Sequence, residues 1–254
     1  MTTLHFTARV PVFDANIRVG DRHDDPAPFR DRNELLTEMD RHGVGRAVVY
    51  HAHTEFYSPT EGNDMLAAWI GDDGRLVPQW SMMPTTTSLA QIQALHAEQC
   101  VSSVRLHETM TVGLPFRPWA YDTMLTWLSE HQIPLWIPLP DMDTDDLVTT
   151  LQAYPDLVSM IVGGHYMHAL LVRPLLMALP NAHWELSRYE PMGEVEALCH
   201  EFGAHRFVYG SWYPRYAMGP ILFYLHHASF SRTGSSEVVL SQICAGNLER
   251  ILHR

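Results

Sequence analysis

The sequence predicts an α/β fold, a (β/α)8 TIM-like barrel that forms a single domain over residues 1–254. Eight short apolar runs alternate with segments of helical periodicity, which is typical of strand and helix units repeated around a parallel sheet. A chain of 254 residues is long enough for one such barrel and contains no Gly/Ser-rich linker. An open doubly wound sheet is the alternative, but no G-x-G-x-x-G follows the first apolar run.

The predicted elements follow from these runs in chain order. The strands are expected at residues 8–15, 45–51, 76–82, 101–107, 133–139, 157–164, 182–187 and 205–211. The helices are expected at 31–43, 62–71, 88–99, 118–131, 143–153, 168–179, 191–202 and 245–253. Asp31 can cap the start of the first helix and Gly43 its end. The apolar segment 216–230 predicts another helix that is buried or faces a second subunit, so a homo-oligomer stays open.

Composition narrows the classes of partner. Hydrophobic residues make up 46% of the chain and charged residues 18%, which indicates a globular protein with a large core. The net charge of −12 disfavours binding to nucleic acid or to an anionic membrane, so a small molecule is the expected partner. No cationic leader with an apolar run opens the chain, and no run approaches the roughly 20 apolar residues of a membrane span. A cytoplasmic location is therefore expected.

Two residue types exclude particular chemistries. All 17 basic residues are arginine, so neither a Schiff-base lysine nor a carbamylated lysine between two metals is available. Arginine still offers bidentate recognition of carboxylate or phosphate wherever it enters a pocket. The three cysteines lie far apart without a C-x-x-C, which is typical of reduced intracellular thiols.

Polar residues gather at the carboxyl ends of the predicted strands, where barrel enzymes hold their sites. They are Asp14, Asn16 and Arg18 after strand one, His51 and His53 after strand two, Arg105, His107 and Glu108 after strand four, His165 after strand six, Glu185 in strand seven, and Trp212 and Tyr213 after strand eight. Histidine therefore recurs at several of the strand ends that would surround one site.

Four motifs carry a resemblance to a known family. Strand one reads Asp14-Ala15-Asn16-Ile17-Arg18, strand six ends in Gly164-His165, strand eight continues as Gly210-Ser211-Trp212-Tyr213-Pro214, and the last helix reads Gly246-Asn247-Leu248-Glu249-Arg250-Ile251-Leu252. The chain resembles, over essentially its whole length, the amidohydrolase-related family of metal-dependent TIM-barrel hydrolases and decarboxylases. The resemblance implies D-x-H-x-H in strand one, P-x-x-x-H in strand five, a histidine in strand six and G-S-D-W/Y-P in strand eight.

The implied metal ligands are largely replaced in this sequence. Asn16 and Arg18 stand at the two histidine positions of strand one, Pro138 at that of strand five, and Trp212 at the aspartate position. A catalytic Zn²⁺ site needs about three nitrogen or carboxylate ligands, and only His165 remains of the implied set. We therefore expect no metal at the family's position and no other cofactor, with the positive charge of Arg18 facing an anionic substrate instead.

Three functions remain open. The first is a metal-independent hydrolase or lactonase for a small carboxylate-bearing molecule, with proton transfer by His107, His165 or Glu185. Arg18 and Arg105 would hold the anion there, and the wall would comprise Asn16, His51, His53, Trp212 and Tyr213. The second is a catalytically inactive pseudoenzyme that binds a metabolite or partner, its pocket filled by Trp136, Trp212 and Tyr213. The third is a metalloenzyme with relocated ligands at His51 and His53, completed by His107 or Glu185.

Two of these residues have a purely structural alternative. Arg18 can pair with Asp21 or Asp24 in the loop that follows it. Glu185 can be the ion-pair partner of an arginine.

Overall fold

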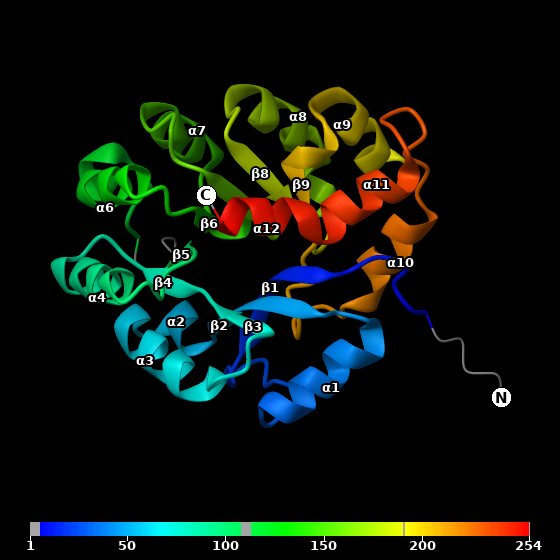
Figure 1. Cartoon of the computed structure of the whole chain (residues 1–254). Helices are drawn as coiled ribbons and strands as arrows, with labels where there is room; N and C mark the ends of the chain where they lie inside the picture. The colour runs from blue at the N-terminus through cyan, green and yellow to red at the C-terminus, as the bar shows by residue number, and fades with distance from the viewer. Residues whose placement is uncertain (1–5, 108–112, 190, 254) are drawn as a thin grey trace.

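A computed structural model of the chain describes residues 6–107, 113–189 and 191–253, and its strands close into a parallel barrel (Figure 1). The strands are β1 (Phe13–Val19), β2 (Arg46–His51), β3 (Leu76–Pro78), β4 (Trp80–Met82), β5 (Val104–Leu106), β6 (Leu135–Pro138), β7 (Ser159–Val162), β8 (Ala182–Glu185) and β9 (Phe207–Val208). Each pairs with the next in parallel within the orders β1-β2-β3 and β4-β5-β6-β7-β8-β9.

Two contacts join these sheets into one barrel. β3 and β4 are halves of the third barrel strand on either side of Gln79, whose backbone N–H donates to Val49 O at 2.8 Å. The last strand meets the first through Ala15 N and Tyr209 O at 3.1 Å and a parallel bridge between Ile17 and Tyr213. The predicted (β/α)8 fold class is therefore confirmed.

Helices surround the barrel (Figure 1). They are α1 (Arg32–His42), α2 (His53–Phe56), α3 (Pro59–Ile70), α4 (Thr86–Ala97), α6 (Pro118–Glu130), α7 (Thr144–Ala153), α8 (Ala169–Ala178), α9 (Glu194–Phe202), α10 (Gly219–His227), α11 (Ser236–Ser241) and α12 (Asn247–Leu252). Asp31 caps α1 as expected, because its side chain accepts from Glu34 N at 3.0 Å, and Gly43 ends the helix at φ 72°. No helix among the described residues is long and apolar enough to cross a membrane.

The first strand lies further along the chain than predicted. β1 begins at Phe13 and runs to Val19, whereas the apolar run suggested residues 8–15. Two further predictions miss detail: α2 and α11 were not expected, and the closing helix divides into a π-helical segment, Gln242–Gly246, followed by α12. The predicted helix within 216–230 is α10, which buries Leu222 and Leu225 and exposes Phe223.

A bulge in β1 decides which side chains enter the barrel. The pairing with β2 shifts between Asp14 and Ile17, so three residues of β1 oppose two of β2. Phe13 and Ala15 pack in the inner core with Trp136, whereas Ile17 packs in the outer core that the helices cover. Because side chains alternate along a strand, this change of face turns Asn16 and Arg18 inward above the inner core.

Candidate functional site

Polar side chains form a buried layer at the carboxyl ends of the strands, where the apolar inner core stops. The layer comprises Asn16 and Arg18 from β1, Tyr50 from β2, Arg105 from β5 and Glu185 from β8, each at most 4% exposed. The strand sequence alternates so that the apolar neighbours of these residues pack outward against the helices. This buried layer is thus built on strands rather than on loops.

Asn16 connects a positive and a negative residue within this layer. Arg105 Nη1 donates to Asn16 Oδ1 at 3.2 Å, and Asn16 Nδ2 donates to Glu185 Oε2 at 3.5 Å. Glu185 also accepts from Ser187 N at 2.7 Å and from Gly163 N at 3.3 Å. No arginine in the described part of the chain forms an ion pair with Glu185, so the structural alternative suggested for it is wrong: its partners are an amide and two backbone N–H groups.

Two buried carboxyl groups have raised pKa values. Burial raises the pKa of Glu185 to about 7, against the opposing effect of its hydrogen bonds. Burial likewise raises the pKa of Asp14 to about 6, although the backbone N–H groups of Asn16 and Ser211 each donate to its Oδ1 at 2.9 Å. Here the loss of hydration destabilises each charged carboxylate more than its hydrogen-bond donors stabilise it. Glu185 is completely buried, and a substrate would reach it only after a rearrangement.

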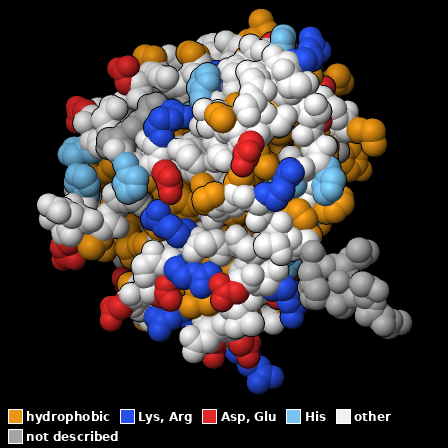
Figure 2. Space-filling view, turned by 45° about the vertical axis from the view of Figure 1, so that its right-hand side comes forward, with side chains coloured by type: hydrophobic (Ala, Val, Ile, Leu, Met, Phe, Trp, Pro, Cys, Tyr) orange, Lys and Arg blue, Asp and Glu red, His pale blue; other side chains and the backbone are white. Residues whose placement is uncertain are grey.

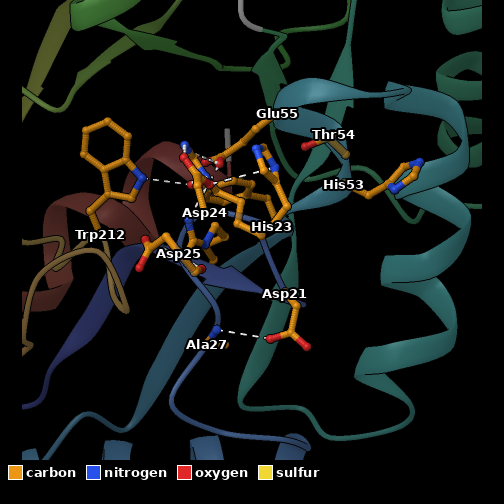
Figure 3. A network of polar contacts seen from close by, with 12 residues as sticks. Asp21, His23, Asp24, Asp25, Ala27, His53, Thr54, Glu55 and Trp212 are labelled. Carbon is orange, nitrogen blue, oxygen red and sulfur yellow. Dashed lines mark hydrogen bonds and ion pairs between the residues drawn. The ribbon is translucent and has the colours of Figure 1, made fainter.

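Arg18 takes part in a polar network with Asp25 and Glu55, both of which are labelled in Figure 3. Its Nη2 donates to Asp25 Oδ2 at 2.9 Å and to Asp25 O at 2.8 Å, and its Nη1 lies 3.8 Å from Glu55 Oε2. Arg22 reaches the same Glu55 oxygen at 2.8 Å. The pairing suggested for Arg18 is therefore right in kind, but its partners are Asp25 and Glu55 rather than Asp21 or Asp24.

Trp212 and Tyr50 cover the centre of the mouth. The Trp212 indole N–H donates to the Tyr50 hydroxyl at 2.8 Å, and that hydroxyl donates to Glu55 Oε1 at 2.7 Å. The Arg105 guanidinium carbon lies 4.0 Å from the centre of the Tyr50 ring, which is a cation–π contact. Gly163 makes room for the indole, because a Cβ built on this glycine would lie 2.1 Å from the Trp212 ring. Trp212 thus fills space at the mouth, as the pseudoenzyme hypothesis expected.

His107 lies beside this layer with one ring nitrogen engaged. Its Nδ1 is within hydrogen-bond distance of the Thr54 carbonyl oxygen, which can only accept, so Nδ1 carries the proton. Burial lowers the pKa of His107, so the ring is neutral near pH 7. Its Nε2 is then an unprotonated base, and it has no hydrogen-bond partner within residues 6–107, 113–189 and 191–253.

Two further arginines stand near the mouth without a carboxylate partner. Arg215 places its guanidinium carbon 4.7 Å from the centre of a Trp212 ring, and its side chain is exposed. Arg188 lies 4.5 Å over the Tyr216 ring and donates to the Tyr216 hydroxyl at 2.7 Å. Among the described residues, neither forms an ion pair with an acidic side chain, and neither does Arg105.

Asp141 lies within the field of these cations. Burial raises its pKa, while the charges of Arg105 and Arg215 act in the opposite direction. Asp141 also lines a hollow of about 370 Å³ together with Phe116 and Met142. Asp143 and Asp146 also line this hollow, and among the described residues no arginine does.

Four predicted site residues lie outside the buried layer, although one of them, His165, forms a backbone bridge with Arg188. His53 begins α2 instead of extending β2, and its Nε2 is 3.1 Å from Glu61; Figure 3 shows it pointing away from the cluster around Asp24, Asp25 and Glu55. His51 packs against Gly20, on the opposite side of β2 from Tyr50. His165 is half-buried at the rim, where its ring packs on Tyr166 at 3.9 Å. The Tyr213 ring stacks on Phe29 of the β1–α1 loop at 5.7 Å.

The donor set at the mouth does not fit a metal ion. Arg18 is a fixed cation there, and Asn16 directs its oxygen to Arg105. Within the described residues, no three histidine, cysteine, aspartate or glutamate side chains are placed to hold one ion, and the rings of His51 and His53 do not converge. The relocated site suggested for those histidines is therefore not supported; Glu108 lies outside the described residues.

Sequence reasoning did not identify five residues of the site. They are Tyr50, Glu55, Asp141, Arg188 and Arg215. Tyr50 was detectable, because it precedes His51 by one position and therefore faces the opposite side of the same strand. Glu55 lies in α2, Asp141 in the 3-10 helix Leu139–Asp141, and Arg188 and Arg215 in loops, where spacing along the sequence does not give the direction of a side chain.

Comparisons with known proteins show the same fold. No protein-family model matches the sequence, and no curated protein matches it. Among solved structures, an uncharacterized TIM-barrel protein from Bordetella bronchiseptica is 16% identical over 96% of this chain and 98% of its own, with a TM-score of 0.76. The 5-carboxyvanillate decarboxylase LigW from Sphingomonas paucimobilis is 14% identical over 96% and 99%, with a TM-score of 0.73. Amidohydrolase 2 from Bifidobacterium longum subsp. infantis is 12% identical over 96% and 98%, with a TM-score of 0.60. At these identities the resemblance seen in the motifs is confirmed for the fold.

Proposed function

We propose that the mouth of this amidohydrolase-like barrel binds a small carboxylate-bearing molecule and hydrolyses an ester or lactone bond in it without a metal ion. The observation that carries the proposal is the group of Arg105, Arg188 and Arg215. None of them forms an ion pair with a carboxylate in the described part of the chain, although the protein has a net charge of −12 and Asp141 lies within the electrostatic reach of Arg105 and Arg215. Cations that an acidic protein leaves without acidic partners at a barrel mouth are suited to bind an anion.

The surface around the site supports a small ligand. On the face seen in Figure 2, basic side chains lie among acidic ones rather than in one broad basic area. The name of the Sphingomonas protein says that it acts on 5-carboxyvanillate, which fits a mouth of this fold that receives a carboxylate.

His107 is the proposed base. Its unprotonated Nε2 takes a proton from water, the resulting hydroxide adds to the ester carbonyl, and the proton passes to the leaving alkoxide as the C–O bond breaks. An arginine of the mouth stabilises the negative charge on the carbonyl oxygen in the transition state. Glu185, which belongs to the layer, and Asp14, which accepts from the backbone N–H groups of Asn16 and Ser211, take no part in this step.

A second candidate is a binding protein without turnover. Trp212, which is 4% exposed, occupies the centre of the mouth between Gly163 and Tyr50. Such a protein would bind the carboxylate-bearing ligand without hydrolysing it.

The test is binding and turnover with matched compounds. Calorimetry with benzoate and with neutral benzamide should show binding of the acid alone, and the Arg215→Gln substitution should weaken it about tenfold, which corresponds to one charge-assisted hydrogen bond. Arg232→Gln is the matched control, because Arg232 is exposed between α10 and α11. Equal affinity of the two variants would contradict the proposed anion site.

Turnover is screened with carboxylated lactones and esters and with the corresponding uncharged esters. Hydrolysis of the acids only would support the enzyme. Binding of the acids without hydrolysis across the panel would favour the second candidate.

A further inference from the structure

Only some of the N–H groups of the Arg18 guanidinium form hydrogen bonds. Its Nη2 donates to the backbone carbonyl oxygen and to Oδ2 of Asp25, whereas its Nε is buried and has no hydrogen-bond partner. The side chain is 1% exposed. A buried cationic N–H without a partner is costly, since it has lost water and gained nothing in return.

Arg22, four positions further along, shows the complete arrangement. Its Nε donates to Asp24 Oδ1 and its Nη2 to Asp24 Oδ2, both at 2.7 Å. These two N–H groups point in parallel from one edge of the guanidinium and match the two oxygens of a carboxylate. At the same edge of Arg18, the Asp25 carboxylate reaches only the outer N–H.

Asp25 lies in a more exposed part of the molecule than Arg18 does. Its side chain is 43% exposed, and it lies in the segment between β1 and α1 that crosses the mouth near Glu55 (Figure 3). The geometry of this loop sets where the carboxylate can reach, because the Asp25 backbone carbonyl binds the same Nη2. A free carboxylate has no such tether.

We propose that Arg18 is a receptor for a ligand carboxylate and that Asp25 is its internal substitute, which leaves when the ligand binds. The ligand carboxylate takes the Nε–H and Nη2–H together, so the exchange replaces the two contacts with Asp25 by two to the ligand, one of which satisfies the buried Nε–H. Glu55, 3.8 Å from Nη1, stays with Arg18 throughout. This inference rests on the proposed function in one respect: it assigns the group by which the ligand of the mouth is held.

The proposed receptor, Arg18, stands in β1 at a position where the family resemblance implies a metal-binding histidine. The bulge in β1 turns Arg18 inward, and Tyr50 and Glu55 connect it to Arg105 through a cation–π contact and two polar contacts. A ligand with its carboxylate on Arg18 would therefore extend toward Arg105 and the other arginines of the mouth. Asp25 and the loop around it would move away from Arg18 on binding.

The experiment uses formate, the smallest carboxylate, because it needs no contact beyond Arg18. The Nε–H resonance of Arg18 is followed by ¹H–¹⁵N NMR during titration of the whole protein, and Arg18→Lys identifies it by its disappearance. We expect the resonance to move downfield with saturation. In Asp25→Ala the formate affinity should rise at least about threefold, whereas Asp24→Ala, which alters the neighbouring pair, should leave it within about twofold.

Two results would overturn the inference. One is an Arg18 Nε–H resonance that formate does not move in the wild-type protein and in Asp25→Ala. The other is an equal change of affinity in Asp25→Ala and Asp24→Ala. Failure of the proposed function looks different: benzoate binding would then be insensitive to Arg215→Gln, while the response of Arg18 to formate would persist.

Discussion

Trp212 and Tyr50 are joined by a hydrogen bond of 2.8 Å between the indole N–H and the phenolic oxygen, which links the end of the last strand to the second across the barrel mouth. The same hydroxyl donates to Glu55, and Glu55 accepts from Arg22. Each group in this chain has a defined donor or acceptor role. The family resemblance implies an aspartate at the position of Trp212. In this protein the indole at that position donates a hydrogen bond, and its ring fills space at the barrel mouth.

The first prediction concerns that indole. Trp212→Phe keeps most of the ring volume and removes the donor, so it should lower the free energy of unfolding by about 0.5–1.5 kcal/mol. Trp212→Ala also opens a cavity and should cost about 3–5 kcal/mol. Urea denaturation measures both, with Trp119→Phe as the control because Trp119 is 73% exposed. Equal stability of Trp212→Ala and the wild type would show that the ring is not packed as described.

The strands of the barrel were largely predictable because apolar runs of the right length mark them. The first strand is the exception, and its shift has a physical reason. Asn16 and Arg18 are polar, so a hydrophobic pattern ends the strand before them, whereas the barrel mouth buries them inside β1, where Asn16 contacts Glu185 and Arg105 and Arg18 contacts Asp25.

The site was predictable only in part for a related reason. Arg18, Arg105, Asn16 and Trp212 were identified because strand ends are aligned in a barrel. Glu55 was missed because the residues around it were interpreted as extended, which would have placed His53 beside His51. In the structure α2 begins at His53, and that turn of helix directs Glu55 toward Tyr50 instead.

The second prediction concerns Glu55, which serves Arg18 and Arg22 together. Glu55→Gln keeps the shape and removes the charge, which leaves buried Arg18 with less compensation, so the free energy of unfolding should fall by about 3–5 kcal/mol. Glu38→Gln is the matched control, because Glu38 pairs with Arg41 at the surface and should change stability by about 0–1 kcal/mol. Chemical denaturation compares the two, and similar losses would mean that the Glu55 pairs are not a buried unit.

The third prediction is a fall of stability with rising pH. The pKa of Asp14 is about 6 in the fold and 3.8 without burial, so the folded state binds the extra proton between these values. The contribution is fully present below pH 3.8 and is lost as the pH rises through about 6. Glu185, with a pKa of about 7, acts in the same direction at slightly higher pH.

Asp14→Asn tests the assignment to one carboxyl group. The amide does not titrate, so relative to its own value at pH 4 the variant should retain on the order of 3 kcal/mol more at pH 8 than the wild type does. The slope that Glu185 contributes should decrease in part, because the charge of Asp14 is one of the causes that raise the pKa of Glu185. Parallel pH profiles of the two proteins in urea denaturation would argue against a raised pKa for Asp14.

The fourth prediction concerns the residue that would perform the chemistry. With a hydrolysed substrate in hand, His107→Ala should lower kcat by about 10²- to 10⁴-fold, because no bound metal is expected to activate the water in place of a base. KM should change little, since the arginines rather than His107 hold the ligand. His165→Ala should leave both constants close to the wild-type values, because His165 lies at the rim with its ring on Tyr166.

The pH profile separates a base from a merely structural histidine. Burial lowers the pKa of His107, and the base is active in its unprotonated form, so kcat should stay high as the pH falls and decline only below the ordinary histidine value of about 6.5. His107→Asn can still donate to the Thr54 carbonyl through its amide, and it should fold normally while it loses both the rate and this acid limb. A variant that keeps the wild-type rate and profile would remove His107 from the mechanism, because the hydrogen bond to Thr54 would then be its whole contribution.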